Sequence, residues 1–111
     1  MLVHVSDGNL YFYKGDHQPV GFYSGKQISF TKQKIKVNKN DMIYLFSDGY
    51  QDQFGGERNK KFMISKLKKL LLKISNENVD TQLQKLKTEF ELWKGNEEQI
   101  DDVCLMGVRI I

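Results

Sequence analysis

Cysteine and proline are nearly absent from this sequence of 111 residues, which contains one of each. Cys104 alone cannot form an internal disulfide, and this excludes a small secreted domain held together by disulfides. The chain does not open with a charged segment, an apolar core and a small-residue cleavage site, so we expect no secretory signal. Its longest apolar runs, such as residues 42–46, fall far short of the roughly 20 residues that a membrane-spanning helix needs. We therefore expect a soluble protein in a reducing, cytoplasmic setting, with no membrane contact by this segment.

Charge of one sign is not in strong excess, because 17 lysines and arginines face 14 acids and the net charge is +3. The basic residues that gather in one region alternate with apolar residues at helical spacing, which is typical of a solvated helix face. No interleaved aromatic residues offer a stacking platform, so we expect no nucleic-acid partner. The alternative, binding of nucleic acid or of an acidic protein, predicts a strongly salt-dependent affinity. The basic residues are Arg58, Lys60, Lys61, Lys66, Lys68, Lys69 and Lys73.

The apolar pattern predicts a single domain of strands, two helices and a final strand, since the chain is too short for two cores. Asp7-Gly8 between two β-rich runs predicts a hairpin turn. Met42–Phe46 is continuously apolar, as in a central strand covered on both faces. Residues 14–21 have the composition of a loop. The expected strands are Leu2–Val5, Leu10–Tyr13, Gln27–Phe30, Gln33–Val37, Met42–Phe46 and Val103–Ile111.

Two stretches with a helical period lie between the strand at 42–46 and the last strand. From Lys61 onward, apolar residues recur at a spacing of three and four and predict an amphipathic helix that ends near Ile74. Residues 75–78 have capping chemistry and separate it from a second helix that ends at Gly95. We expect the two helices to form a hairpin. The apolar stripe of the second helix consists of Val79, Leu83, Leu86, Phe90 and Trp93.

Two acidic turns are the candidate functional site. Asp48-Gly49 follows the apolar strand and begins a long loop, so a tight hairpin turn does not explain this aspartate. Asp101-Asp102 lies just before the last strand. Adjacent like charges repel unless a cation compensates them, although paired acids also occur in plain solvated turns. Oxygen ligands without a His/Cys cluster favour magnesium or manganese, and the spacing does not fit a calcium EF-hand. We interpret His4 and His17 as surface residues, not as ligands.

Four segments together resemble the SpoIIE-like branch of the metal-dependent PPM serine/threonine phosphatases. They are residues 41–56, with the sequence DMIYLFSDGYQDQFGG, residues 90–95 (FELWKG), residues 99–103 (QIDDV) and the loop at 14–21. The resemblance covers essentially the whole chain and implies an α+β fold. That fold is a partial PPM-phosphatase-like domain, a mostly antiparallel β-sheet with a two-helix hairpin inserted before the last strand. Nothing in residues 1–13 matches the family's turn with the bridging aspartate, so residues 1–111 resemble one partial domain, the C-terminal half.

The resemblance also implies roles for individual acids. Asp48 and Asp101 match the family's metal ligands, Asp102 matches a supporting or alternative ligand, and Asp52 matches a position linked in some members to an additional metal. Cys104 stands where the family usually has threonine, which we expect to affect packing more than ligation. No catalytic side chain is assigned. The implied cofactor is Mn²⁺ or Mg²⁺, in a two-metal site that is incomplete in this chain.

The function that this resemblance implies is hydrolysis of phosphoserine or phosphothreonine by metal-activated water. The partner would be a phosphorylated signalling protein of a bacterial pathway. Because the bridging aspartate is missing, we expect the isolated chain to be inactive or very weak. Exposed sheet edges also predict a homodimer. The main alternative is a non-catalytic protein-interaction module with the same fold, in which the acids are structural.

Overall fold

The computed structural model of the chain describes residues 1–14 and 34–111. Its main element is a four-stranded sheet in which every neighbouring pair is antiparallel, in the order β2-β1-β3-β6. The strands are β1 (Leu2–Ser6), β2 (Asn9–Tyr13), β3 (Met42–Phe46) and β6 (Leu105–Arg109). The predicted mostly antiparallel sheet is confirmed, and β3 is an internal strand as expected.

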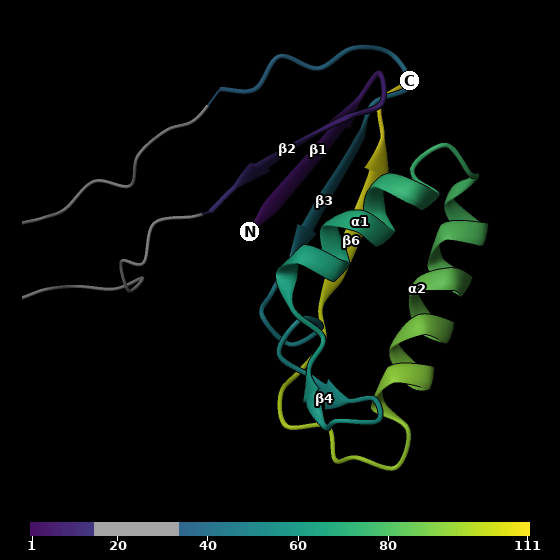
Figure 1. The fold of residues 1–111 in the computed structure, drawn as a ribbon. Helices are drawn as coiled ribbons and strands as arrows, with labels where there is room; N and C mark the ends of the chain where they lie inside the picture. Colours follow the sequence, from purple (N-terminus) through teal and green to yellow (C-terminus); the bar gives the residue numbers. More distant parts are fainter. Residues whose placement is uncertain (15–33) are drawn as a thin grey trace, which may run out of the picture.

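Two helices follow β3 in the chain and cover one face of the sheet (Figure 1). They are α1 (Ile64–Ile74) and α2 (Val79–Lys94), and the chain turns back between them at residues 75–78. Asn78 caps α2, because its side chain accepts a hydrogen bond from the Thr81 backbone N–H at 2.8 Å. A short two-stranded sheet, β4 (Phe54–Gly55) with β5 (Lys60–Lys61), precedes α1 and was not predicted. The helix pair before the last strand confirms the predicted α+β class.

The β1–β2 hairpin has the turn that its sequence predicts. Asp7 and Gly8 both have positive φ, 49° and 78°, and Ser6 pairs with Asn9 across the turn. Positive φ at both central residues is what a type I′ turn requires, and Asp-Gly supplies it at low cost. This aspartate is therefore explained by the turn alone.

The core lies between the sheet and the helices, where alternate strand residues meet the buried faces of α1 and α2. Two buried tyrosines bind α2 through their hydroxyls: Tyr44 donates to Gln82 Oε1 at 2.5 Å and Tyr50 donates to the Leu86 carbonyl at 2.7 Å. Burial raises the pKa of both phenols, which keeps them neutral donors. The buried apolar residues are Val3, Val5, Met42, Tyr44, Phe46, Tyr50, Phe62, Leu67, Leu71, Ile74, Leu86 and Phe90.

The apolar stripe predicted for α2 is only partly buried. Leu86 and Phe90 are in the core and Trp93 packs against it, whereas Val79 and Leu83 are each 48% exposed. Gln82 is buried in their place, because it bonds to Tyr44 and, through Nε2, to the carbonyls of the turn before α2. The hydrogen bonds of Gln82 thus determine which side of the first turns of α2 faces the core. The spacing of the apolar residues does not predict this orientation.

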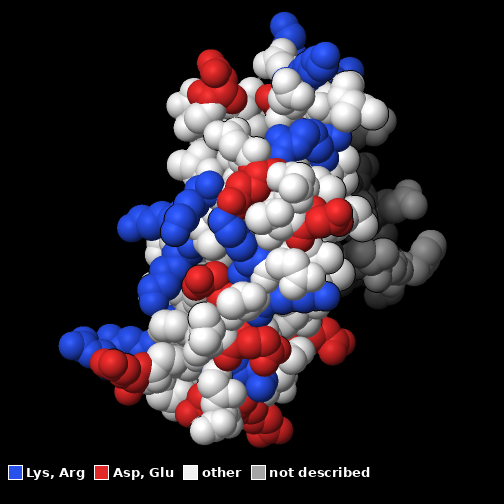
Figure 2. Space-filling view, turned by 90° about the vertical axis from the view of Figure 1, so that its right-hand side faces the viewer, with Lys and Arg blue, Asp and Glu red and all other residues white. Residues whose placement is uncertain are grey.

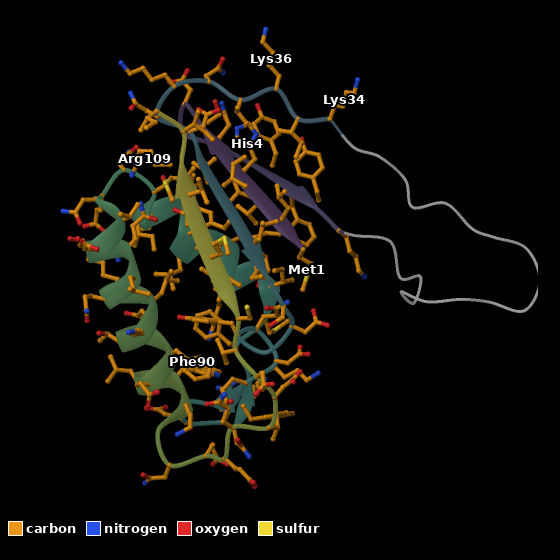
Figure 3. The ribbon with its side chains drawn as sticks, turned by 180° about the vertical axis from the view of Figure 1, so that it is seen from behind. Met1, His4, Lys34, Lys36, Phe90 and Arg109 are labelled. Carbon is orange, nitrogen blue, oxygen red and sulfur yellow. The ribbon has the colours of Figure 1, made fainter. Side chains whose placement is uncertain are left out.

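The prediction that β3 is covered on both faces is wrong. Leu45 is 47% exposed and Ile43 is only partly buried, and their partners Met106 and Val108 on β6 are exposed as well. We call these four residues the outer face. Figure 3 shows the sheet from this side, with α1 behind the strands and α2 beside β6. A continuous apolar run does not distinguish burial on two faces from a strand with one face uncovered by the described residues.

The strand predicted at Gln33–Val37 is also wrong for its described part, because residues 34–37 belong to no strand. Their lysines are exposed, and Figure 3 shows Lys34 and Lys36 pointing away from the sheet. Both sides of β1 and of β3 already carry partner strands, so alternation alone gave this segment no position in the sheet. Gln33, the strand predicted at 27–30, the loop at 15–21 and His17 lie outside the described residues.

His4 is buried, not on the surface as predicted. Its Nε2 lies 2.8 Å from Asp41 Oδ2, and the same oxygen accepts the Asn38 backbone N–H at 2.8 Å. These two contacts hold the pKa of Asp41 below its usual value, because both stabilise the ionised carboxylate. The pair fixes the start of β3 against β1. A histidine in an apolar strand carried no signal of this distant partner.

Charges of both signs are interspersed on the side of the molecule that carries α2, as Figure 2 shows. This mixture agrees with a solvated helix surface on that side. Lys66 and Lys68 also place their ammonium groups over the aromatic rings of Trp93 and Phe12, at 3.9 and 4.1 Å from the ring centroids. Neither α1 nor α2 combines the length and the apolar content that a membrane crossing requires.

Candidate metal site

The register of β3 and β6 brings the two predicted acidic turns together. Phe46, the last residue of β3, pairs with Leu105, the first residue of β6. Beyond this pair, the Ser47 backbone N–H donates to the Cys104 carbonyl at 3.0 Å. Because the strands are antiparallel, the residues after β3 must lie beside those before β6. Asp48 and the pair at 101–102 therefore share one end of the sheet, as their positions in the sequence suggested.

Gly49 allows the two turns to make backbone contact. A Cβ atom at this position would lie 2.1 Å from the Asp102 carbonyl oxygen and 2.8 Å from its carbon. No side chain fits there, so the glycine of the Asp-Gly pair is required by close approach. The Ser47 hydroxyl adds weak bonds at 3.4 Å to the Asp102 carbonyl and to the Cys104 N–H. The junction is thus set by the backbone and does not depend on the carboxylates.

The loop after Asp48 is anchored in the core, which gives the candidate site a fixed wall. Tyr50 packs against Phe62 and Phe90, with ring centroids 5.3 and 5.1 Å away. The Gln53 carbonyl accepts the Trp93 indole N–H at 2.8 Å. The buried Gln53 amide in turn donates to two backbone carbonyls at 3.0 Å. Phe90 and Trp93, expected in the core, therefore help to hold the loop that follows Asp48.

The four predicted acids have different surroundings. Asp48 is exposed, and one of its oxygens accepts the Gln51 side-chain N–H at 3.2 Å. Asp101 is exposed and uses Oδ1 to accept the Asp102 backbone N–H at 2.8 Å, and the Asp102 side chain is exposed as well. Asp52 lies one helical turn after Asp48, but its carboxylate is 3.7 Å from Lys61 Nζ. The backbone thus places the turn of Asp48 against the turn of Asp102, whereas Asp52 faces a lysine.

The donor set fits a hard divalent cation in part. Carboxylate oxygens on two adjacent turns are what Mg²⁺ or Mn²⁺ takes from a protein, with waters filling other positions. Among residues 1–14 and 34–111, however, no three His, Cys, Asp or Glu side chains form a group that could hold a metal ion. Gln51, whose Nε2 bonds to Asp48, also has a buried Oε1 that finds no hydrogen-bond partner among the described residues, so a polar group beside Asp48 is left unsatisfied. Asp48 and Asp101 are the residues that would hold the ion.

Gln51 and Gly49 are the residues whose importance sequence reasoning missed. Gly49 could have been noticed, since an Asp-Gly pair outside a hairpin turn suggests close backbone approach. Gln51 carried no signal, because glutamine in a loop is ordinarily solvated. Cys104 is exposed, and its backbone, not its sulfur, contacts Ser47. Its expected effect on packing stays a prediction.

The sheet order, the helix pair and the joined turns together have the fold of part of a PP2C domain. The fold matches the solved SiaA-PP2C domain of Pseudomonas aeruginosa with a TM-score of 0.85 and 22% identity, over 99% of this chain and 42% of that chain. The family model for Stage II sporulation protein E (SpoIIE) matches residues 1–111. The chain belongs to the SpoIIE family, as its motifs predicted. No curated protein matches it.

Proposed function

We propose that this chain forms part of a metal-dependent protein serine/threonine phosphatase of a bacterial signalling pathway. In this proposal it supplies one wall of a site for Mn²⁺ or Mg²⁺. The observation that carries the proposal is the backbone contact between the Asp48-Gly49 turn and the Asp101-Asp102 turn, in a chain of the SpoIIE family. A phosphorylated signalling protein would be the substrate. A cytoplasmic location belongs to the same proposal, since a signalling phosphatase acts where its substrate is.

Divalent cations at such a site lower the pKa of bound water and neutralise charge on phosphoryl oxygens. The residues of this chain would hold and position the ion. Asp48 and Asp101 offer carboxylates on turns whose backbones are in contact, and the core contacts of Tyr50 keep the first turn in place. Asp102 is the alternative ligand on the second turn. Asp52 would have to leave Lys61 to reach an additional ion.

The chain spans 42% of the matched SiaA chain, and its described residues form no group of three acidic, His or Cys side chains that could hold a metal ion. We therefore expect the 111-residue chain alone to release no detectable phosphate from phosphoserine or phosphothreonine peptides with Mn²⁺ present. Phosphate release followed over hours at high chain concentration is the measurement. Turnover that depends on Mn²⁺ and disappears with chelator would contradict the incomplete site.

The second candidate is a non-catalytic interaction module, which the exposed outer face favours. Heat unfolding with and without Mn²⁺ separates the two proposals. A cation that binds only the folded chain raises its melting temperature as its concentration rises above its Kd. An unchanged melting temperature at millimolar Mn²⁺ would favour the interaction module.

A homodimer is proposed on the same surface. No strand of residues 1–14 and 34–111 pairs with the outer edge of β2 or of β6, and the outer face exposes Leu45, Met106 and Val108. Burying such apolar area removes it from water, and free strand edges can pair. We expect sedimentation at high concentration to show dimers, and a Leu45→Lys, Met106→Lys double variant to sediment as a monomer. A clean monomer of the unaltered chain would contradict this.

A further inference from the structure

Gln51 is a buried amide that uses one end and leaves the other without a partner. The residue is 6% exposed. Its Nε2 donates to Asp48 Oδ1 at 3.2 Å and lies 3.4 Å from the sulfur of Met1. Its Oε1 is buried and has no hydrogen-bond partner in the part of the chain that the structure describes. A buried carbonyl oxygen without a donor costs stability, so such a group in a folded protein calls for an explanation.

The orientation of the amide is determined by Asp48. Reversing it would place Oε1 against the carboxylate oxygen, where two acceptors repel, so the N–H end must face Asp48. Oxygen and nitrogen of one amide are about 2.2 Å apart, which leaves the unpartnered oxygen within about 5.5 Å of the Asp48 carboxylate. The Gln51 amide oxygen is thus left without a described partner, while the amide N–H bonds to the Asp48 carboxylate.

We propose that Gln51 is a positioning residue that orients the Asp48 carboxylate for a divalent cation. This inference rests on the proposed metal site. The exposed Asp48 side chain would otherwise sample several rotamers, and a cation would then have to order it on binding. A donor on one carboxylate oxygen leaves the other oxygen free for the ion, as hydrogen bonds from outer groups do in other metal sites.

A matched pair of variants tests the inference. Methionine has nearly the length of glutamine and no amide, so Gln51→Met removes the bond to Asp48 together with the unpartnered oxygen. Gln53→Met is the control, because Gln53 is fully buried and its Oε1 also lacks a partner among the described residues. Its amide donates to the backbone carbonyls of Phe54 and Glu98 and to no carboxylate.

With Mn²⁺ as the probe, we expect Gln51→Met to weaken binding roughly 10- to 100-fold. Its urea midpoint should stay unchanged or rise, because an unsatisfied oxygen is lost from the interior. Gln53→Met should lower the urea midpoint and leave Mn²⁺ affinity within about threefold, since its amide contacts neither the Asp48 nor the Asp101 carboxylate. Unchanged Mn²⁺ affinity in Gln51→Met would overturn the positioning role, whether or not the urea midpoint of this variant falls.

A measurement without metal separates failure of this inference from failure of the proposed function. If the unaltered chain binds no Mn²⁺, the metal site fails, and NMR of the Gln51 side-chain amide then decides on positioning. We expect Asp48→Ala to move these amide resonances and Asp52→Ala to leave them in place. If these resonances keep their positions in Asp48→Ala, the amide does not hold this carboxylate and the inference is wrong.

Discussion

Replacing Gly49 with alanine is expected to lower the free energy of unfolding by roughly 3 kcal/mol, the upper end for overpacking a well-fitted site. The added Cβ would lie 2.1 Å from the Asp102 carbonyl oxygen, so the backbones at 48–50 and 101–103 must separate. Separation breaks the contacts of Ser47 with Asp102 and Cys104. Because backbone meets backbone, no side-chain rotation can relieve the clash. Urea unfolding measures the effect.

Gly107→Ala is the matched control. A Cβ at Gly107 would meet only side chains, Tyr44 at 3.2 Å and Met42 at 3.4 Å, which can shift by a few tenths of an ångström. We expect this variant to cost less than about 1 kcal/mol. If Gly49→Ala were as stable as Gly107→Ala, the two acidic turns would not be in contact, and the candidate site would not exist in this form.

Replacing Asp48 with asparagine is expected to reduce Mn²⁺ affinity by roughly 100-fold or more, a larger loss than removal of a supporting hydrogen bond causes. Asparagine keeps the size of the side chain and removes the charge that a hard cation requires. Asp101→Asn should act in the same direction, since its turn faces the same junction. Titration calorimetry with Mn²⁺ gives the affinities, and Asp48 is exposed, so the fold should tolerate the change.

Asp52→Asn controls for a general loss of negative charge. The Asp52 carboxylate is 3.7 Å from Lys61 Nζ, and the two side chains are 39% and 52% exposed, so they form a surface ion pair that contributes little to stability. We expect its Mn²⁺ affinity to stay within about threefold of the unaltered chain, an estimate based on screened charge at a distance. An equal loss in Asp52→Asn and Asp48→Asn would mean that charge, and not a defined ligand, attracts the ion.

Local chemistry predicted those parts of the fold that local forces determine. The Asp7-Gly8 turn, the Asn78 cap and the buried face of α1 follow from backbone preference and helical period. The errors arose where distant partners decide. Residues 34–37 alternate like a strand but pair with no strand of the described sheet. The apolar run of β3 predicts cover on both faces, although Leu45 is exposed.

The candidate site was predictable in its acids and not in its supports. Asp48 and Asp101 were evident because acids at strand ends are unusual, and antiparallel pairing of β3 with β6 brings their turns together. The bond from Gln51 to Asp48 and the carbonyl beside Gly49 depend on the path of the loop, which sequence spacing does not encode. The sequence does not predict these two contacts for the same reason that it does not predict the contact between His4 and Asp41, which are distant in the sequence.

Paramagnetic broadening of backbone amide resonances by Mn²⁺ tests most directly whether a cation binds between the two acidic turns. Added in substoichiometric amounts to the ¹⁵N-labelled chain, Mn²⁺ should first broaden residues 47–52 and 100–104, the segments that meet at Gly49. Asp48→Asn should abolish this pattern. Broadening centred elsewhere, for example on the exposed acids Glu97 and Glu98, or no selective broadening at all, would contradict the proposed site.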